Sequence, residues 1–178
     1  MKVLVVIDMQ NDFIDGPLGT PEAKAIVSNV AAKVKEYAHS DDGVLVYTRD
    51  THYKDYMETL EGKNLPVPHC LIGTNGWEIR EEVFEDGSYV IDKTTFGRYN
   101  LGNAVWVAAG EKYGKTNIES IEIVGLCTDI CVISNAMILK AFYEDIPIIV
   151  DSSCCAGVTP ERHAAALEAM KCCQIEVI

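Results

Sequence analysis

The chain has 178 residues, a length that suits one domain with a hydrophobic core of its own. Its composition, 48% hydrophobic and 24% charged, excludes disordered, collagen-like and coiled-coil chains. The 27 acidic residues outnumber the 15 basic ones and give a net charge of −12, so neither nucleic acid nor a membrane surface is expected as a partner. We therefore predict a single domain over residues 1–178.

The chain alternates between apolar, β-branched runs and segments with helical periodicity. The β-branched runs predict strands at residues 2–7, 44–48, 89–92, 120–125, 146–151 and 175–178. The helical pattern predicts helices at residues 20–39, 103–113, 128–143 and 160–172. A polar segment fills residues 49–76, and loops of that length inside a domain are usually functional. This alternation predicts a three-layer α/β domain, with a parallel sheet between two layers of helices.

The cysteine content and the apolar runs indicate the compartment. Seven cysteines are an odd number, and no two of them have the spacing of a CxxC motif. The apolar run at residues 3–7 ends at an acid rather than continuing as a signal peptide would. No run is long enough to cross a bilayer. We expect a cytoplasmic protein whose thiols are reduced.

The residues that follow the predicted strands are candidates for a functional site, because ligands of such sheets bind beyond the carboxyl ends of the strands. They are Asp8, Asp50, Lys93, the segment 126–131 and Asp151. This placement predicts that groups far apart in the sequence meet at one edge of the sheet.

Asp8, Lys93 and Cys131 form a set suited to acyl transfer through a thioester. A thiol becomes a strong nucleophile when it is ionised, and a nearby ammonium group and a helix N-terminus lower its pKa. A carboxylate beside it can accept the proton and return it to a leaving amine, and backbone N–H groups in the 127–131 turn can hold the oxyanion. Taken singly, these residues have more ordinary interpretations: a buried apolar thiol, a capping acid and a solvated lysine.

The long polar segment contains a second group of side chains, Asp50, His52, Glu61 and His69. Their oxygen and imidazole donors suit Zn²⁺, Fe²⁺ or Mn²⁺, with coordination positions left for water or substrate. In an extended segment, Asp50 and His52 point to the same side. The alternative interpretation is a polar surface loop without a metal.

Five motifs are similar to those of one known family. They are VVIDMQNDF at residues 5–13, TRDTH at 48–52, PHCLIGT at 68–74, DKTTF at 92–96 and GLCTDICV at 125–132. On these motifs, which run in the family's order along nearly the whole chain, the sequence resembles the isochorismatase-like cysteine hydrolases. Within that family it is most similar to the nicotinamidases, also called pyrazinamidases.

The resemblance implies a fold and a catalytic group. The sheet would have six parallel strands in the order 3-2-1-4-5-6, and Asp8, Lys93 and Cys131 would be the catalytic triad. It also implies a cis peptide bond between Leu126 and Cys127, which would turn the amides of Cys127 and Cys131 toward one oxyanion.

The resemblance further implies a metal ion and a pocket for the substrate. Asp50, His52 and His69 would hold a divalent metal that binds the pyridine nitrogen of the substrate, with Glu61 as an additional ligand. We expect zinc, with iron or manganese as alternatives. Phe13 and Gln10 would line the substrate pocket.

These expectations together predict an enzyme that converts nicotinamide to nicotinate and ammonia. One alternative is another family member that hydrolyses a different small amide, ureide or carbamoyl compound. The other is a non-catalytic α/β module that binds a metal or a ligand. Cys131 argues against the isochorismatases themselves, which cleave a vinyl ether without a cysteine. The expected partner is a small-molecule amide, and we also expect a homo-oligomer.

Overall fold

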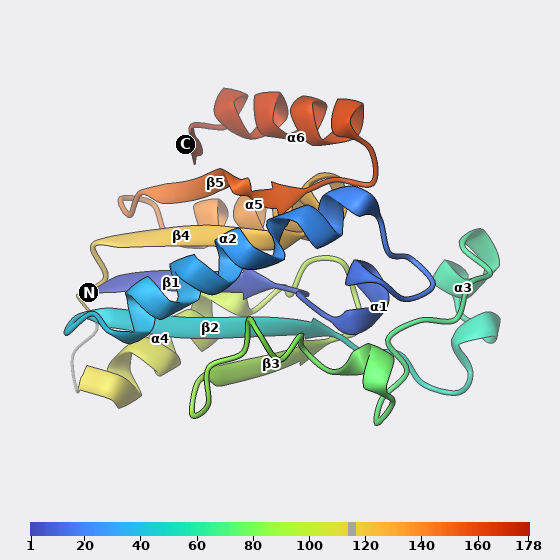
Figure 1. The fold of residues 1–178 in the computed structure, drawn as a ribbon. Coiled ribbons are helices and arrows are strands. Elements are labelled where there is room, and N and C mark those ends of the chain that lie inside the picture. The colour runs from blue at the N-terminus through green and yellow to red at the C-terminus, as the bar shows by residue number, and fades with distance from the viewer. Residues whose placement is uncertain (114–116) are drawn as a thin grey trace.

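The computed structural model describes residues 1–113 and 117–178, and its centre is a parallel β-sheet (Figure 1). The strands are β1 (Lys2–Ile7), β2 (Gly43–Asp50), β3 (Tyr89–Lys93), β4 (Ser120–Leu126), β5 (Ile148–Ala156) and β6 (Glu176–Val177). They lie in the order β3-β2-β1-β4-β5-β6, and every neighbouring pair is parallel. The predicted fold and strand order are therefore confirmed.

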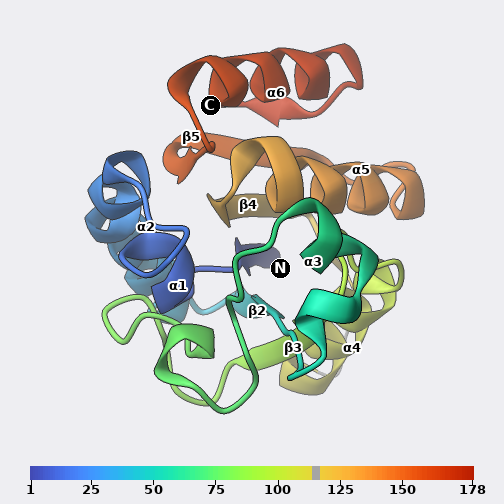
Figure 2. The same cartoon turned by 90° about the vertical axis from the view of Figure 1, so that its right-hand side faces the viewer.

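Helices cover both faces of the sheet. They are α1 (Asn11–Ile14), α2 (Pro21–Ala38), α3 (Leu60–Asn64), α4 (Leu101–Tyr113), α5 (Ile133–Phe142) and α6 (Pro160–Cys172). Viewed along the strands, α1 and α2 lie on one side of the sheet and α4 and α5 on the other (Figure 2). Among the described residues, no helix has both the length and the apolar character needed to cross a bilayer.

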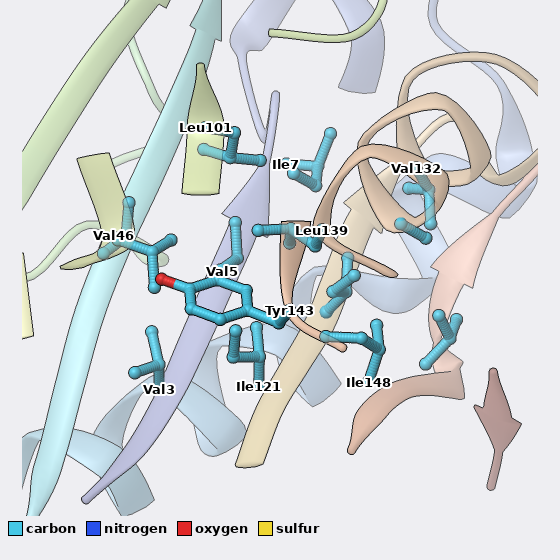
Figure 3. Close-up of a cluster of buried hydrophobic side chains, with 14 of the residues drawn as sticks. Val3, Val5, Ile7, Val46, Leu101, Ile121, Val132, Leu139, Tyr143 and Ile148 are labelled. Carbon is cyan, nitrogen blue, oxygen red and sulfur yellow. The ribbon is translucent and has the colours of Figure 1, made fainter. Parts of the chain in front are cut away.

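The central strand β1 explains why the sheet has two apolar faces. Successive side chains of a strand point to opposite faces. Val3, Val5 and Ile7 pack with residues of α4 and α5, such as Leu139, on one face (Figure 3). Leu4 and Val6 pack against α2 on the other face. Side chains of β1 are buried on both faces, as a continuous apolar run predicts.

The structure corrects the predicted end of the fifth strand. The expected strand ended at residue 151, but β5 continues to Ala156. Asp151 therefore lies within the strand, where its Oδ2 is 2.9 Å from Nζ of Lys33 on α2. Lys33 also lies 2.7 Å from Glu122 on β4. This shared cation stabilises both carboxylates, so these polar residues can remain in the sheet, away from the candidate site.

Two further elements differ from the sequence prediction. The expected helix at 128–143 divides into a π-helical turn, Thr128–Val132, and α5. The expected loop at 49–76 contains short helical pieces at Tyr56–Glu58, Leu60–Asn64 and Asn75–Trp77. Pieces of three to five residues are too short to produce a periodic pattern in the sequence.

Candidate active site

The carboxyl ends of four neighbouring strands place the candidate residues at one end of the sheet. Asp8 follows β1, Asp50 ends β2, Lys93 ends β3 and Cys127 follows β4. Asp50 and Lys93 are partners in the register of β2 and β3. Figure 2 looks onto this end, with α3 in front of the sheet. The predicted meeting of these distant residues therefore occurs.

Asp8, Lys93 and Cys131, which we call the triad, are in contact and buried. Nζ of Lys93 lies 2.7 Å from Oδ2 of Asp8 and donates a 3.5 Å hydrogen bond to Sγ of Cys131. The other oxygen of Asp8 accepts a 2.7 Å hydrogen bond from the Thr48 hydroxyl. The ammonium group is thus held between a carboxylate and a thiol.

Burial controls the proton affinities of the triad. It raises the pKa of Asp8, and the ammonium of Lys93 opposes this effect only in part. Burial also raises the pKa of the Cys131 thiol well above its ordinary value, again against Lys93. The sequence predicted a lowered thiol pKa, and this was wrong because only 6% of Cys131 is exposed to solvent. The free protein therefore keeps the proton on sulfur, beside a carboxylate whose proton affinity is also increased.

Asp50, His52, Glu61 and His69 come together beside the triad. Their donor atoms all lie within 4.8 Å of one another. Nε2 of His52 is 2.9 Å from Oδ2 of Asp50 and 3.5 Å from Oε1 of Glu61, and Nε2 of His69 is 3.6 Å and 3.7 Å from the same two atoms. Three of the four residues are buried. The four side chains therefore converge on one place, although much of the intervening segment, such as Tyr53 and Leu60, is exposed as a surface loop would be.

The surroundings of the two histidines fit a divalent metal. Nδ1 of His69 lies 2.8 Å from the carbonyl oxygen of Val67, which leaves Nε2 of His69 free to bind a metal. Nε2 of His52 is buried and has no well-directed hydrogen bond. Burial by itself lowers the pKa of His52, but the carboxylates of Asp50 and Glu61 outweigh it and raise the pKa to about 9. Two imidazoles and two carboxylates are donors that zinc accepts.

One cavity joins the triad to this group. It has a volume of about 260 Å³ and is lined by Cys127 and Cys131 as well as by Asp50, Glu61 and His69. The rest of its wall is largely apolar and includes Phe13, Leu18, Leu65, Phe96, Ile130 and Val158. The Phe13 ring centroid lies 5.5 Å from that of His69. Phe13 thus lines the cavity, where the resemblance places it.

The model of the isochorismatase domain matches residues 2–178 of the chain. The chain belongs to the isochorismatase family. It is 27% identical to the nicotinamidase/pyrazinamidase of Mycobacterium tuberculosis, over 100% of this chain and 98% of that protein. The solved structures similar to it include the following two. The pyrazinamidase of Pyrococcus horikoshii in complex with zinc has a TM-score of 0.79 and 24% identity, over 99% of this chain and 98% of that one. The N-carbamoylsarcosine amidase of Thermoplasma acidophilum has a TM-score of 0.74 and 29% identity, over 99% of this chain and 94% of that one.

In this family member, Gln10 holds the backbone of Asp50 rather than lining the cavity. Gln10 is completely buried, and its Oε1 accepts a 2.7 Å hydrogen bond from the N–H of Asp50. Its Nε2 donates 2.8 Å hydrogen bonds to the carbonyls of Asp50 and Trp77. The resemblance placed Gln10 in the substrate pocket, and the structure corrects this expectation. No sequence pattern revealed its role as a support, which depends on two partners far away in the chain.

Asp50 connects the two groups of side chains. Its Oδ1 lies 3.4 Å from Nζ of Lys93, and its Oδ2 faces His52 and His69. Burial alone raises the pKa of Asp50, but the two imidazoles beside its carboxylate and the charge of Lys93 hold that pKa below its usual range. The triad and the candidate metal ligands therefore share one carboxylate.

Backbone geometry places Cys127 and Cys131 on the wall of the cavity. The peptide bond between Leu126 and Cys127 is cis, the conformation that the resemblance implies. The N–H groups of Ile130 and Val132 both donate to the carbonyl of Cys127. No carbonyl in a turn or loop of residues 1–113 and 117–178 accepts a hydrogen bond from the N–H of Cys127. This N–H is therefore a free donor at the edge of the cavity.

Proposed function

We propose that this isochorismatase-family chain is an amidohydrolase that converts nicotinamide to nicotinate and ammonia. The observation that carries the proposal is the single cavity that opens both to Cys131 and to the Asp50, Glu61 and His69 side chains. The similarity to the nicotinamidase/pyrazinamidase of Mycobacterium tuberculosis over the whole chain supports the same reaction class.

The shape and polarity of the cavity suit a small aromatic amide. A volume of about 260 Å³ accommodates a single six-membered ring with a carboxamide, and the apolar wall contacts the faces of that ring. The polar groups lie on two parts of the wall. One is the thiol of Cys131, where the carboxamide carbon would lie. The other is the His69 side, where the ring nitrogen would lie.

Asp50, His52, Glu61 and His69 would hold a divalent cation, with zinc as the first expectation. When bound, such a cation supplies a Lewis acid for the ring nitrogen of the substrate. The solved pyrazinamidase of Pyrococcus horikoshii contains zinc, which supports this choice of metal. Phe13 beside His69 would contact the ring and hold its orientation.

The first half of the reaction forms a thioester on Cys131. Sγ of Cys131 attacks the carboxamide carbon while its proton moves to Asp8, whose pKa is raised by burial and therefore favours acceptance. Lys93, within 3.5 Å of both groups, stabilises the thiolate as it forms. The free N–H of Cys127 can donate to the developing oxyanion. Asp8 then returns the proton to the nitrogen, and the C–N bond breaks to release ammonia.

The second half regenerates the enzyme with one molecule of water. Asp8 removes a proton from the water as its oxygen attacks the thioester carbon, and the same N–H donor holds the second oxyanion. The C–S bond then breaks and releases nicotinic acid, which loses its carboxyl proton to solvent and becomes nicotinate. The sulfur of Cys131 takes back the proton from Asp8, which restores the starting state of the triad.

The decisive experiment measures ammonia release from nicotinamide by the purified protein, with and without prior removal of metal by a chelator. We expect release that chelation abolishes and added zinc restores, and no release from Cys131→Ala. Cys172→Ala serves as a matched control, because Cys172 is an exposed thiol on α6 and should leave the rate unchanged. Release from other small amides but not from nicotinamide would overturn the proposed substrate. No release from any amide would instead favour the non-catalytic binding module.

A further inference from the structure

Arg162 is a cation without a partner on the wall of the candidate active-site cavity. It lies in the first turn of α6 and lines the same cavity as Cys131, next to Val158 and Ile130. Its backbone N–H donates to Oγ1 of Thr159, but its guanidinium has no ion pair or hydrogen bond to any residue in the described part of the chain.

Two of the other three arginines form ion pairs within the described residues. Arg49 pairs with Asp92 at 2.7 Å and covers the Trp77 ring, and Arg80 pairs with Asp15 at 2.6 Å. Arg98 has no ion pair. Its guanidinium lies 5.8 Å from the centroid of the Tyr99 ring, and its Nε is buried without a hydrogen bond. Arg162 differs from Arg98 in that it lines the candidate active-site cavity.

No acid close to Arg162 forms an ion pair with it within residues 1–113 and 117–178. Asp129 lines an adjacent groove with Arg162, but its Oδ1 accepts the N–H of Val158 at 3.0 Å. Asp50 and Glu61 line the same cavity, but both lie against the histidines of the candidate metal site. The positive charge of Arg162 is therefore available to a ligand.

Stability of α6 does not account for this arginine. A cation in the first turn of a helix opposes the helix dipole, which favours negative charge there. The turn already has its Thr159 cap and an acid, Glu161, at the favourable end. Removing the charge of Arg162 should therefore leave the protein as stable as before, which separates a role in binding from a role in folding.

We propose that Arg162 forms a carboxylate subsite on the α6 side of the cavity, so that the enzyme also accepts small amides that carry a carboxylate and binds them more tightly than neutral amides of the same size. The inference rests on the proposed amidohydrolase function and extends its substrate class to anionic amides. A guanidinium presents two parallel N–H donors that match the two oxygens of a carboxylate. The amide of such a substrate would face Cys131, while its carboxylate would lie at the α6 side of the cavity.

The test compares two matched pairs of amides that differ by one carboxylate. The rigid pair is nicotinamide and the monoamide of pyridine-3,5-dicarboxylic acid, and the flexible pair is butyramide and the monoamide of succinic acid. For at least one pair, Arg162→Gln should lower kcat/KM of the anionic member about tenfold, through KM, and change the neutral member less than about twofold. Arg162→Lys should retain part of the preference, and the melting temperature should not fall.

Lys171→Gln is the control, because it removes the same charge from the exposed last turn of α6, away from the cavity. Lys171→Gln should leave kcat/KM unchanged for both the neutral and the anionic amides. Equal losses for neutral and anionic amides in Arg162→Gln, or no loss for either anionic amide, would overturn the inference.

A binding measurement keeps failure of the inference distinct from failure of the proposed function. If no amide is hydrolysed, the amidohydrolase proposal fails, and calorimetric titration of the same four amides into the parent and Arg162→Gln proteins still tests Arg162. Tighter binding of an anionic member that depends on Arg162 and weakens in 0.5 M salt would support the inference. Equal binding of both members of each pair would overturn it.

Discussion

Replacing Lys93 by Met should cost both stability and activity, and the structure sets the size of the first effect. The Lys93 ammonium is completely buried, 2.7 Å from Asp8 and 3.4 Å from Asp50. Methionine has a similar volume but no charge, so two buried carboxylates would lose their cation. Removing one partner of a buried ion pair costs about 3–5 kcal/mol. For a domain of this size, that loss lowers the melting temperature by roughly 10 °C.

The stability deficit should depend on pH, with a sign that follows from Asp8. Burial raises the pKa of Asp8 in the folded protein, and loss of Lys93 removes the charge that opposes this effect. A carboxyl whose folded pKa exceeds its unfolded value stabilises the fold below the unfolded pKa, and this stabilisation is lost as pH rises. The deficit of Lys93→Met should therefore be greatest near pH 7 and shrink toward pH 4.

Urea unfolding at several pH values, together with ammonia release at temperatures where the variant is folded, measures both effects. Lys33→Met is the control, because Lys33 also pairs with two largely buried acids, Glu122 and Asp151, but lies outside the cavity. It should lower stability and retain activity. A deficit in Lys93→Met below about 1 kcal/mol at pH 7, or one that grows toward pH 4, would refute the reasoning.

Three further predictions follow from the supports of the site. Gln10→Leu should weaken zinc binding about 10–100-fold, because the backbone of Asp50 loses its two hydrogen bonds to the Gln10 side chain. Competition with a chelating dye measures the zinc affinity. An unchanged affinity would contradict the role assigned to Gln10. Gly125→Ala should lower the free energy of unfolding by at least about 2 kcal/mol, because φ is +120° there and a Cβ would overlap the carbonyl of Ile7. Urea unfolding checks this, and an unchanged midpoint would count against it. Because the pKa of His52 is raised to about 9, zinc binding at pH 7 should release close to one proton. Titration calorimetry in buffers of different ionisation enthalpy counts the proton, and a count near zero would refute the prediction.

The sequence alone determined the architecture and the membership of the site. Short, continuous β-branched runs such as residues 2–7 indicate strands buried on both faces, and their alternation with helices indicates parallel crossovers. Since parallel strands share one carboxyl end, Asp8, Asp50 and Lys93 had to meet there. The motif around Cys131 completed the triad, and the spacing of His52 and His69 relative to Asp50 indicated the candidate metal ligands.

The tertiary structure decided what these residues experience. The thiol of Cys131 has a raised pKa, because packing removes it from water more effectively than Lys93 can compensate. Gln10 holds Asp50 instead of lining the cavity, and Lys33 keeps Asp151 inside the sheet instead of at its end. Each outcome depends on the solvent exposure or on a contact between segments far apart in the chain. A sequence pattern records which side chains are present, whereas burial and long-range contacts, which set their charges and partners, exist only in the folded molecule.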